Sequence, residues 1–171
     1  MSLLANKEGP LPGDVPNAFK VDGAYVYEVS PSLNVNLGGN LRAQQGGPVN
    51  YLGAHPTYGA SEAFILPRGS AGRLPWTWGI NLRAAAQYKL TKDYNLGVSV
   101  DLFNVTNNRE TTSVDENYTF SSVTPIVNGK VSDLAYLKAT DGTPVAKNAN
   151  FLQPTLYQVP FSARLGAKLS F

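Results

Sequence analysis

One histidine, His55, is the only imidazole among the 171 residues, so catalysis that needs a histidine base depends on it. A serine hydrolase would pair His55 with a nucleophile such as Ser61 or Ser70. Neither serine stands in the Gly-x-Ser-x-Gly turn that exposes the nucleophile in one large class of hydrolases. We therefore expect no catalytic residue and a solvated loop position for His55. Of the three functions considered for this chain, a hydrolase built on a β-barrel is the one we favour least.

Metal and cofactor sites also lack their usual residues. The sequence contains no cysteine, which excludes disulfides, thiol nucleophiles and Cys-ligated zinc or iron–sulfur centres. Four acidic residues in one polar stretch could chelate calcium, but their spacing does not match a calcium-binding loop. These residues are Asp115, Glu116, Asp133 and Asp141. We expect solvated loop charges there, and neither a metal nor a cofactor.

The composition is that of a chain rich in β-structure and turns. Fourteen Lys and Arg nearly balance 12 Asp and Glu, so no strongly basic surface indicates a nucleic-acid partner. Charged residues make up 15% of the chain, against about 25% in ordinary soluble domains. No apolar run is long enough for a membrane helix, and the first ten residues do not form a secretory signal.

Apolar and polar residues alternate in five segments, at 19–29, 33–44, 77–90, 94–103 and 159–171, as in strands with two different faces. These segments exceed the usual strand length of about 5–6 residues and suit the roughly 9–11 residues of membrane barrel strands. Aromatic residues stand near both ends of the apolar faces, like the girdles of outer-membrane barrels. They are Phe19 with Tyr27, Trp78 with Tyr88, and Phe161 with Phe171. A soluble sandwich or lipocalin-like barrel would instead turn a polar face outward.

The connections between these segments alternate in length. Residues 30–32 and 91–93 form tight hairpins, whereas 45–76 and 106–157 are long polar stretches without a sustained period. Short periplasmic turns and long extracellular loops alternate in this way in outer-membrane barrels. The sequence therefore predicts an all-β fold. The predicted fold is a transmembrane antiparallel β-barrel fragment of about five long meander strands with long extracellular loops, in which the barrel is incomplete.

The short turns and the odd number of strands together give the expected direction of the chain. With periplasmic short turns, the last strand ends at Phe171 in the periplasm and residues 1–18 lie outside the cell. Complete bacterial single-chain barrels have an even number of strands. We expect residues 1–171 to be part of a larger barrel.

A charged pair supports the pairing of the third and fourth segments. Arg83 and Asp101 both lie nine residues from Lys92 at the centre of their turn, so they face each other across the two strands. Opposite charges in such positions stabilise a pair of strands. We interpret them as a structural pair in the barrel lumen, with solute contact as the alternative.

The C-terminal residues have a further pattern. The pattern is a polar residue, then a glycine, then two hydrophobic residues, of which the last is a terminal aromatic. Its members are Arg164, Gly166, Leu169 and Phe171. This pattern resembles the signal by which bacterial outer-membrane proteins are delivered to the barrel-assembly machinery. We expect these four residues to act as that assembly signal.

Three stretches carry a resemblance to a family. Residues 46–59, 66–76 and 100–107 resemble the C-terminal barrel of Oar-like TonB-dependent outer-membrane receptors, and Pro-Arg-Gly-Ser-Ala-Gly-Arg at 67–73 is the most specific element. The resemblance implies a barrel of about 22 strands closed by an N-terminal plug that contacts TonB. Neither the plug nor a TonB box is found in this sequence.

The resemblance also implies a function, a location and partners. The chain would be a non-catalytic part of a solute-uptake receptor in the bacterial outer membrane. Its partners would be membrane lipid, the barrel-assembly machinery, the remaining barrel and plug, and TonB through that plug. A small complete porin or structural barrel, with further short strands in the long stretches, is the first alternative.

The loop motif before the third strand contains Arg68, Arg73 and Trp76. Pro67 and Pro75 stiffen this segment, and each arginine can bond carboxylates or carbonyls. We expect the motif to fold against the barrel rim or neighbouring loops, and solute contact is the alternative role.

Overall fold

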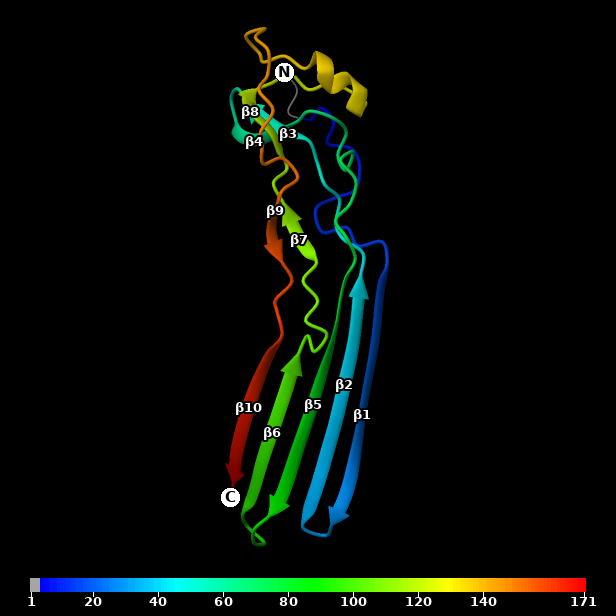
Figure 1. Cartoon of the computed structure of the whole chain (residues 1–171), viewed down its shortest axis with the longest axis vertical. Helices are drawn as coiled ribbons and strands as arrows, with labels where there is room; N and C mark the ends of the chain where they lie inside the picture. The colour runs from blue at the N-terminus through cyan, green and yellow to red at the C-terminus, as the bar shows by residue number, and fades with distance from the viewer. Residues whose placement is uncertain (1–3) are drawn as a thin grey trace. The chain divides into compact units, whose positions relative to one another are not determined.

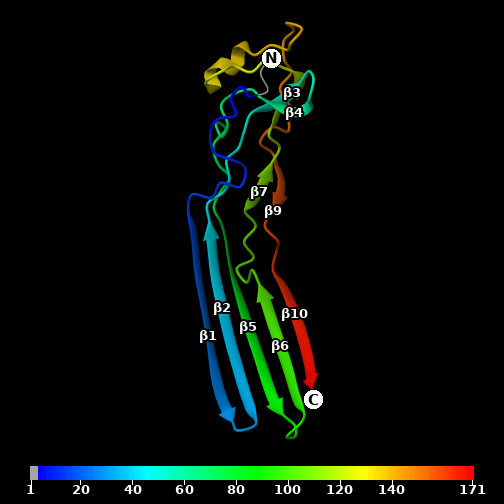
Figure 2. The same cartoon turned by 180° about the vertical axis from the view of Figure 1, so that it is seen from behind.

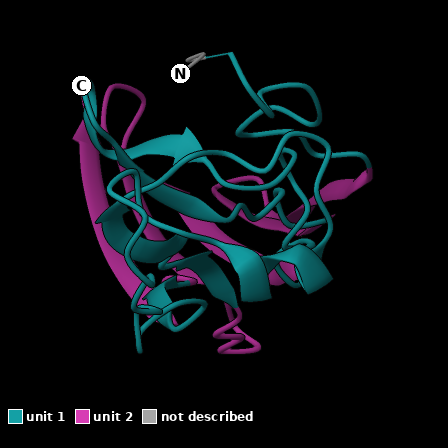
Figure 3. Cartoon of the chain, turned by 90° about the horizontal axis from the view of Figure 1, so that it is seen from above, with its two compact units in different colours: residues 1–16, 45–75, 111–157 teal, residues 17–44, 76–110, 158–171 magenta. Residues whose placement is uncertain are grey.

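The computed structural model describes residues 4–171, and the first three residues of the predicted external segment 1–18 lie outside the described part. The chain divides into two compact units that interleave along the sequence (Figure 3). Unit 1 comprises Met1–Pro16, Gln45–Pro75 and Thr111–Tyr157. Unit 2 comprises Asn17–Gln44, Trp76–Glu110 and Gln158–Phe171.

Unit 2 is one antiparallel sheet of five long strands, in the order β1-β2-β5-β6-β10 (Figure 1). The strands are β1 (Ala18–Ser30), β2 (Leu33–Gln44), β5 (Thr77–Lys89), β6 (Asn95–Phe103) and β10 (Ser162–Ser170). Among the described residues, β1 pairs only with β2 and β10 only with β6, so the sheet is open at both edges (Figure 2). The predicted fold class, an all-β incomplete barrel with long meander strands, is confirmed.

The last strand begins later than the alternation of residues indicates. Its predicted start is residue 159, but β10 begins at Ser162. Pro160 lacks a backbone N–H. The groups on either side of Pro160 bond to side chains instead: the Val159 carbonyl accepts from Asn104 Nδ2 at 2.8 Å, and Phe161 N–H donates to Asn107 Oδ1 at 3.1 Å.

The two faces of the unit 2 sheet differ in polarity, and its apolar face is exposed. Leu165 on β10 is 80% exposed, although leucine is usually buried in a water-soluble fold. Other large apolar side chains of this face are also exposed: Phe19, Val21, Tyr25, Tyr27, Trp78, Leu82, Tyr88, Val98 and Leu169. The opposite face carries the polar members of each alternating segment, and its most buried charged residue is Asp101.

Unit 1 contains short strands where the sequence suggests long stretches without regular structure. Strands β4 (Gly59–Phe64), β3 (Leu52–His55) and β8 (Asn117–Ser122) form a three-stranded sheet in that order. Strands β7 (Thr111–Val114) and β9 (Pro154–Tyr157) form a separate pair. Strands of 4–6 residues with shifted registers give too few alternating positions to stand out in a sequence. A 3-10 helix, η1, covers Val131–Tyr136.

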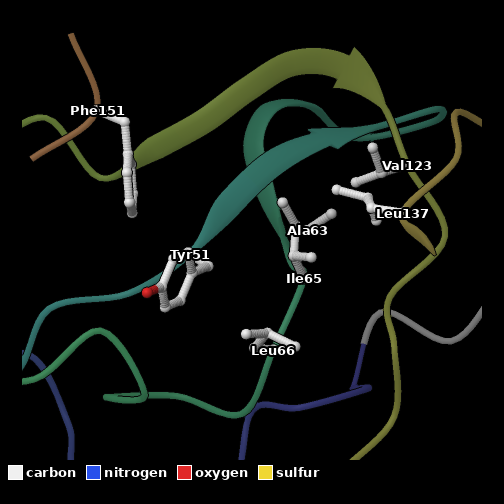
Figure 4. Close-up of a cluster of buried hydrophobic side chains, with 7 residues drawn as sticks. All are labelled: Tyr51, Ala63, Ile65, Leu66, Val123, Leu137 and Phe151. Carbon is white, nitrogen blue, oxygen red and sulfur yellow. The ribbon is translucent and has the colours of Figure 1, made fainter. Parts of the chain in front are cut away.

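The buried apolar cluster of the chain belongs to unit 1 (Figure 4). Its members are Tyr51, Ala63, Ile65, Leu66, Val123, Leu137 and Phe151. Asn6 connects the three segments of this unit, because its Nδ2 donates to the carbonyls of Ile65 and Ile126 at 3.0 Å each. Asn128 N–H donates in return to Asn6 Oδ1 at 3.0 Å. The long stretches therefore have an interior of their own.

No helix within residues 4–171 is long and apolar enough to cross a membrane.

Candidate functional site

The charged centre of the polar face of unit 2 is Asp101, which bonds to arginines on both neighbouring strands. Arg83 on β5 lies directly opposite Asp101 on β6 and donates from Nη1 to Oδ1 at 2.8 Å. Arg164 on β10 lies opposite Asp101 on the other side and donates to Oδ2 from Nε at 3.0 Å and Nη2 at 2.9 Å. One carboxylate thus bridges three strands.

The second arginine is a residue that sequence reasoning assigns to another role. Arg164 is predicted only as part of the assembly signal, yet it belongs to the same cluster as Arg83 and Asp101, the predicted lumen pair. Locating it requires the β6–β10 register, which no short turn provides, because a long segment separates these strands. Its guanidinium also lies over the Phe103 ring, with 5.6 Å from Cζ to the ring centroid.

A shallow depression lies beside this cluster on unit 2, with a cavity volume of about 430 Å³. In the register, Ala24, Gly38, Arg83 and Asp101 form one row across four strands. The first two residues carry little or no side chain, so the row is open at that end. The other lining residues are Asp22, Gly23, Gly39, Asn40, Asn81, Leu82 and Phe103.

The remaining residues of the predicted assembly signal lie along the edge strand. Gly166 lies opposite Ser99, and a Cβ atom at Gly166 would lie 2.8 Å from Ser99 Oγ. Leu169 is an exposed residue of the apolar face. Phe171 is 94% exposed, and its ring centroid is 6.5 Å from that of Tyr94. Recognition by the assembly machinery stays a prediction.

The loop motif contacts the N-terminal segment within unit 1. Arg73 Nη2 forms an ion pair with Asp14 Oδ2, and Nη1 donates to the Gly46 carbonyl at 3.2 Å. Arg68 N–H donates to the Asn6 carbonyl at 2.9 Å, and its guanidinium lies 5.0 Å from the centroid of the Phe64 ring. Trp76 belongs to unit 2 instead, immediately before β5, and is half exposed.

These contacts give a prediction for the two arginines. We expect Arg73→Ala to lower the amount of assembled protein several-fold, because the Asp14 ion pair and the Gly46 bond are both lost, and Arg68→Ala to lower it less. Heat-modifiable mobility on gels measures assembly, and uptake is measured in the same membranes. Arg109→Ala, at an exposed arginine without an ion pair in the described residues, is the control. Normal assembly with reduced uptake would show that the arginines contact solute.

His55 is not the solvated loop residue that the sequence suggests; it lies at the end of β3 and is only 5% exposed. Its Nδ1 accepts backbone N–H bonds from Thr57 at 3.1 Å and Tyr58 at 3.2 Å, so it holds the tight β3–β4 turn. The ring also packs against Tyr58, with 4.8 Å between the ring centroids. Ser61 Oγ donates to Asn117 Oδ1 at 2.6 Å, and no hydrogen bond within residues 4–171 joins a serine to His55.

The acidic residues of the long stretch have structural contacts. Asp115 Oδ1 accepts from Asn117 N–H at 2.9 Å, and Oδ2 accepts from Asn148 Nδ2 at 2.8 Å. Burial raises the pKa of the Asp115 carboxyl, but the hydrogen bonds from Asn117 and Asn148 outweigh it and place the pKa below 3.8. Within the described part of the chain, no three His, Asp or Glu side chains gather as a metal site.

Acid is expected to weaken unit 1 through Asp115. Because the folded pKa is lowered, the stabilisation is fully present above the unfolded pKa and is lost as the pH falls from there through the folded pKa. Asp115→Asn should cost about 1 kcal/mol near neutral pH and flatten this pH dependence. Urea unfolding in detergent at a series of pH values measures both effects. Asp93→Asn, in an exposed turn, is the control substitution.

Comparison with known proteins identifies a relative over the whole chain. The TonB-dependent transporter Oar of Myxococcus xanthus is 34% identical over 184 aligned residues, which include 100% of this chain. The chain spans 17% of the length of that relative. No family model matches the chain, and no solved structure matches it. The predicted resemblance is thereby confirmed, and this chain is similar throughout its length to one part of an Oar-like TonB-dependent receptor.

Proposed function

We propose that this chain forms part of the barrel wall of a TonB-dependent transporter in a bacterial outer membrane. The observation that carries the proposal is the exposed apolar face of the five-stranded sheet, with strands of 9–13 residues. A strand of ten residues rises about 33 Å, and a tilt near 40° reduces this to about 25 Å, the height of a barrel's apolar band. In a water-soluble protein other parts of the chain would cover such an apolar face, whereas in a membrane the lipid covers it.

The polar face then lines the interior of the barrel, and the short turns lie in the periplasm. Unit 1 consists of the N-terminal segment before β1 and the two long segments between strands of the sheet, so it would lie on the extracellular side. The contribution of this chain to uptake is structural and non-catalytic. The rest of the barrel and a plug would complete the transporter, and TonB would act through that plug. Arg164, Gly166, Leu169 and Phe171 would present the assembly signal.

The open sheet supports this proposal over a small complete porin. Within residues 4–171, β1 and β10 each have one paired neighbour, and the short strands of unit 1 form separate sheets instead of closing the barrel. A barrel hydrolase receives no support from His55, whose Nδ1 accepts backbone hydrogen bonds.

Adjacent residues on opposite faces of β6 provide the test of membrane topology. A bimane fluorophore on Val98→Cys should be quenched by brominated lipid, whereas the same fluorophore on Ser99→Cys should not be. The chain has no cysteine that would compete for the label. Equal quenching at both positions would contradict the proposed lipid-facing side.

Binding of the purified C-terminal domain of TonB by the complete protein tests the transporter assignment. We expect the complete protein in detergent to retain this domain. A barrel with the expected pattern of quenching that fails to bind TonB would be a porin or structural barrel instead.

A further inference from the structure

The register of the edge strand β10 against β6 depends on a few polar contacts. Strands β1 and β2, and strands β5 and β6, are joined by short turns, which set their registers. A long segment precedes β10, so no turn fixes its pairing with β6. The outward residues of β10 are Ala163, Leu165, Ala167 and Leu169, an Ala/Leu repeat that still faces outward after a slip of two residues. Apolar burial therefore does not distinguish these registers.

We propose that Asp101 is the register lock of β10, holding Arg164 directly opposite itself. Arg164 bonds through Nε and Nη2 to the same carboxylate oxygen, at 3.0 and 2.9 Å. The Asp101 side chain is only 9% exposed. A two-residue slip would place Ser162 or Gly166 opposite this buried carboxylate and remove two charge-assisted hydrogen bonds.

Steric contacts one row further along favour the same register. Gly166 lies opposite Ser99, and Lys168 lies opposite Gly97, so each side chain faces a glycine. A Cβ atom at Gly166 would lie 2.8 Å from Ser99 Oγ. A slip of two residues places Arg164 or Lys168 opposite Ser99 and forces its hydroxyl to turn away. Charge and shape thus select one alignment.

The start of β10 is held by two asparagines of the segment after β6. Asn104 Nδ2 donates to the Val159 carbonyl, and Asn107 Oδ1 accepts from Phe161 N–H. Asn104 N–H itself donates to Asn81 Oδ1 on β5 at 2.8 Å. These bonds hold the segment before β10 near the end of β6 and favour the same alignment as Asp101. The inference concerns the sheet alone and does not depend on transport.

Disulfide cross-linking can report this register, because the chain has no cysteine of its own. Val98 and Ala167 are direct partners on the outward face, so Val98→Cys with Ala167→Cys reports the native register. Val98→Cys with Leu165→Cys, or with Leu169→Cys, reports a slip of two residues. Opposite Cβ atoms lie about 5 Å apart and diagonal ones about 7–8 Å, so cross-linking discriminates between them.

Three single substitutions test the lock in membranes of cells that express the complete protein. Arg164→Gln and Asp101→Asn should each lower the ratio of native to slipped cross-link about tenfold, as the loss of one charge-assisted bond pair implies. Arg83→Gln is the matched control, because it also removes an arginine from Asp101 but acts between strands that a tight turn already aligns. Mass spectrometry of the linked peptides gives the ratios. Equal loss in Arg164→Gln and Arg83→Gln, or loss in neither, would overturn the proposal.

Moving the charge along β10 gives a second and positive test. Exchange of the two residues, Arg164→Gly together with Gly166→Arg, places the arginine two positions later. The lock predicts that the strand then slips by two residues, and the cross-link moves from Val98→Cys with Ala167→Cys to Val98→Cys with Leu169→Cys. Retention of the native cross-link in this variant, or the absence of both cross-links, would contradict the proposal.

Discussion

Prepared alone in detergent-free buffer, the 171-residue chain should sediment as large aggregates, whereas detergent micelles should keep it in solution. The outward face of unit 2 exposes aromatic and aliphatic side chains on all five strands. Contiguous apolar patches of more than a few hundred Å² are rare on soluble monomers. The outer edges of β1 and β10 also carry backbone groups without a paired strand, which favours association between copies.

Substitutions on the two faces of the sheet test the contribution of the apolar face. Tyr25→Ser with Leu165→Ser removes large apolar groups from the outward face and should raise the soluble fraction several-fold. Asn36→Ser changes an exposed residue of the polar face and should have no effect. Analytical ultracentrifugation measures both variants. A monodisperse wild-type monomer of 18.3 kDa without detergent would contradict the lipid-facing interpretation.

The second large effect is expected from neighbouring glycines in unit 1. A Cβ atom at Gly46 would lie 2.3 Å from the Leu74 carbonyl oxygen, so Gly46→Ala forces backbone apart and should cost about 2–4 kcal/mol. At Gly47 a Cβ atom meets no atom within 4 Å. Gly47→Ala should therefore be nearly neutral.

Hydrogen exchange of the complete protein in detergent measures this difference. The Leu74 N–H donates to the Gly47 carbonyl and the Val49 N–H donates to the Gly72 carbonyl, so both amides report whether the two segments stay paired. We expect faster exchange at both amides in Gly46→Ala only. If both variants exchange at the wild-type rate, the close approach at Gly46 does not stabilise the unit.

The sheet of unit 2 can be predicted from the sequence because its segments alternate over many residues and two tight turns join them. The alternating segment at 19–29 falls within β1, and the turn after β5 places Arg83 opposite Asp101. The same reasoning does not extend to Arg164, because its partner lies on a strand from which a long segment separates it. The register of β10 is a property of side-chain contacts, which a count from a turn does not include.

Unit 1 illustrates the opposite limit. His55 accepts two backbone N–H bonds from the β3–β4 turn and packs against the Tyr58 ring, and no periodicity in the sequence indicates this. Asn6 bonds to carbonyls 59 and 120 residues away, so its role depends entirely on long-range packing. Short strands with shifted registers and polar connections resemble loops until their shared apolar cluster is seen.

The interleaving of the two units has a consequence for the order of folding. The buried cluster of unit 1 combines residues from segments that β5 and β6 separate, such as Tyr51 and Leu137. Gln44 and Thr77 are direct partners at the end of the β2–β5 ladder, so this ladder brings both ends of residues 45–76 together. Closing that loop without the ladder would add an entropic barrier that grows with loop length. Hairpins with short turns form within about 1–10 μs. We therefore expect the strands of the sheet to pair first and the side chains of the unit 1 cluster to pack last.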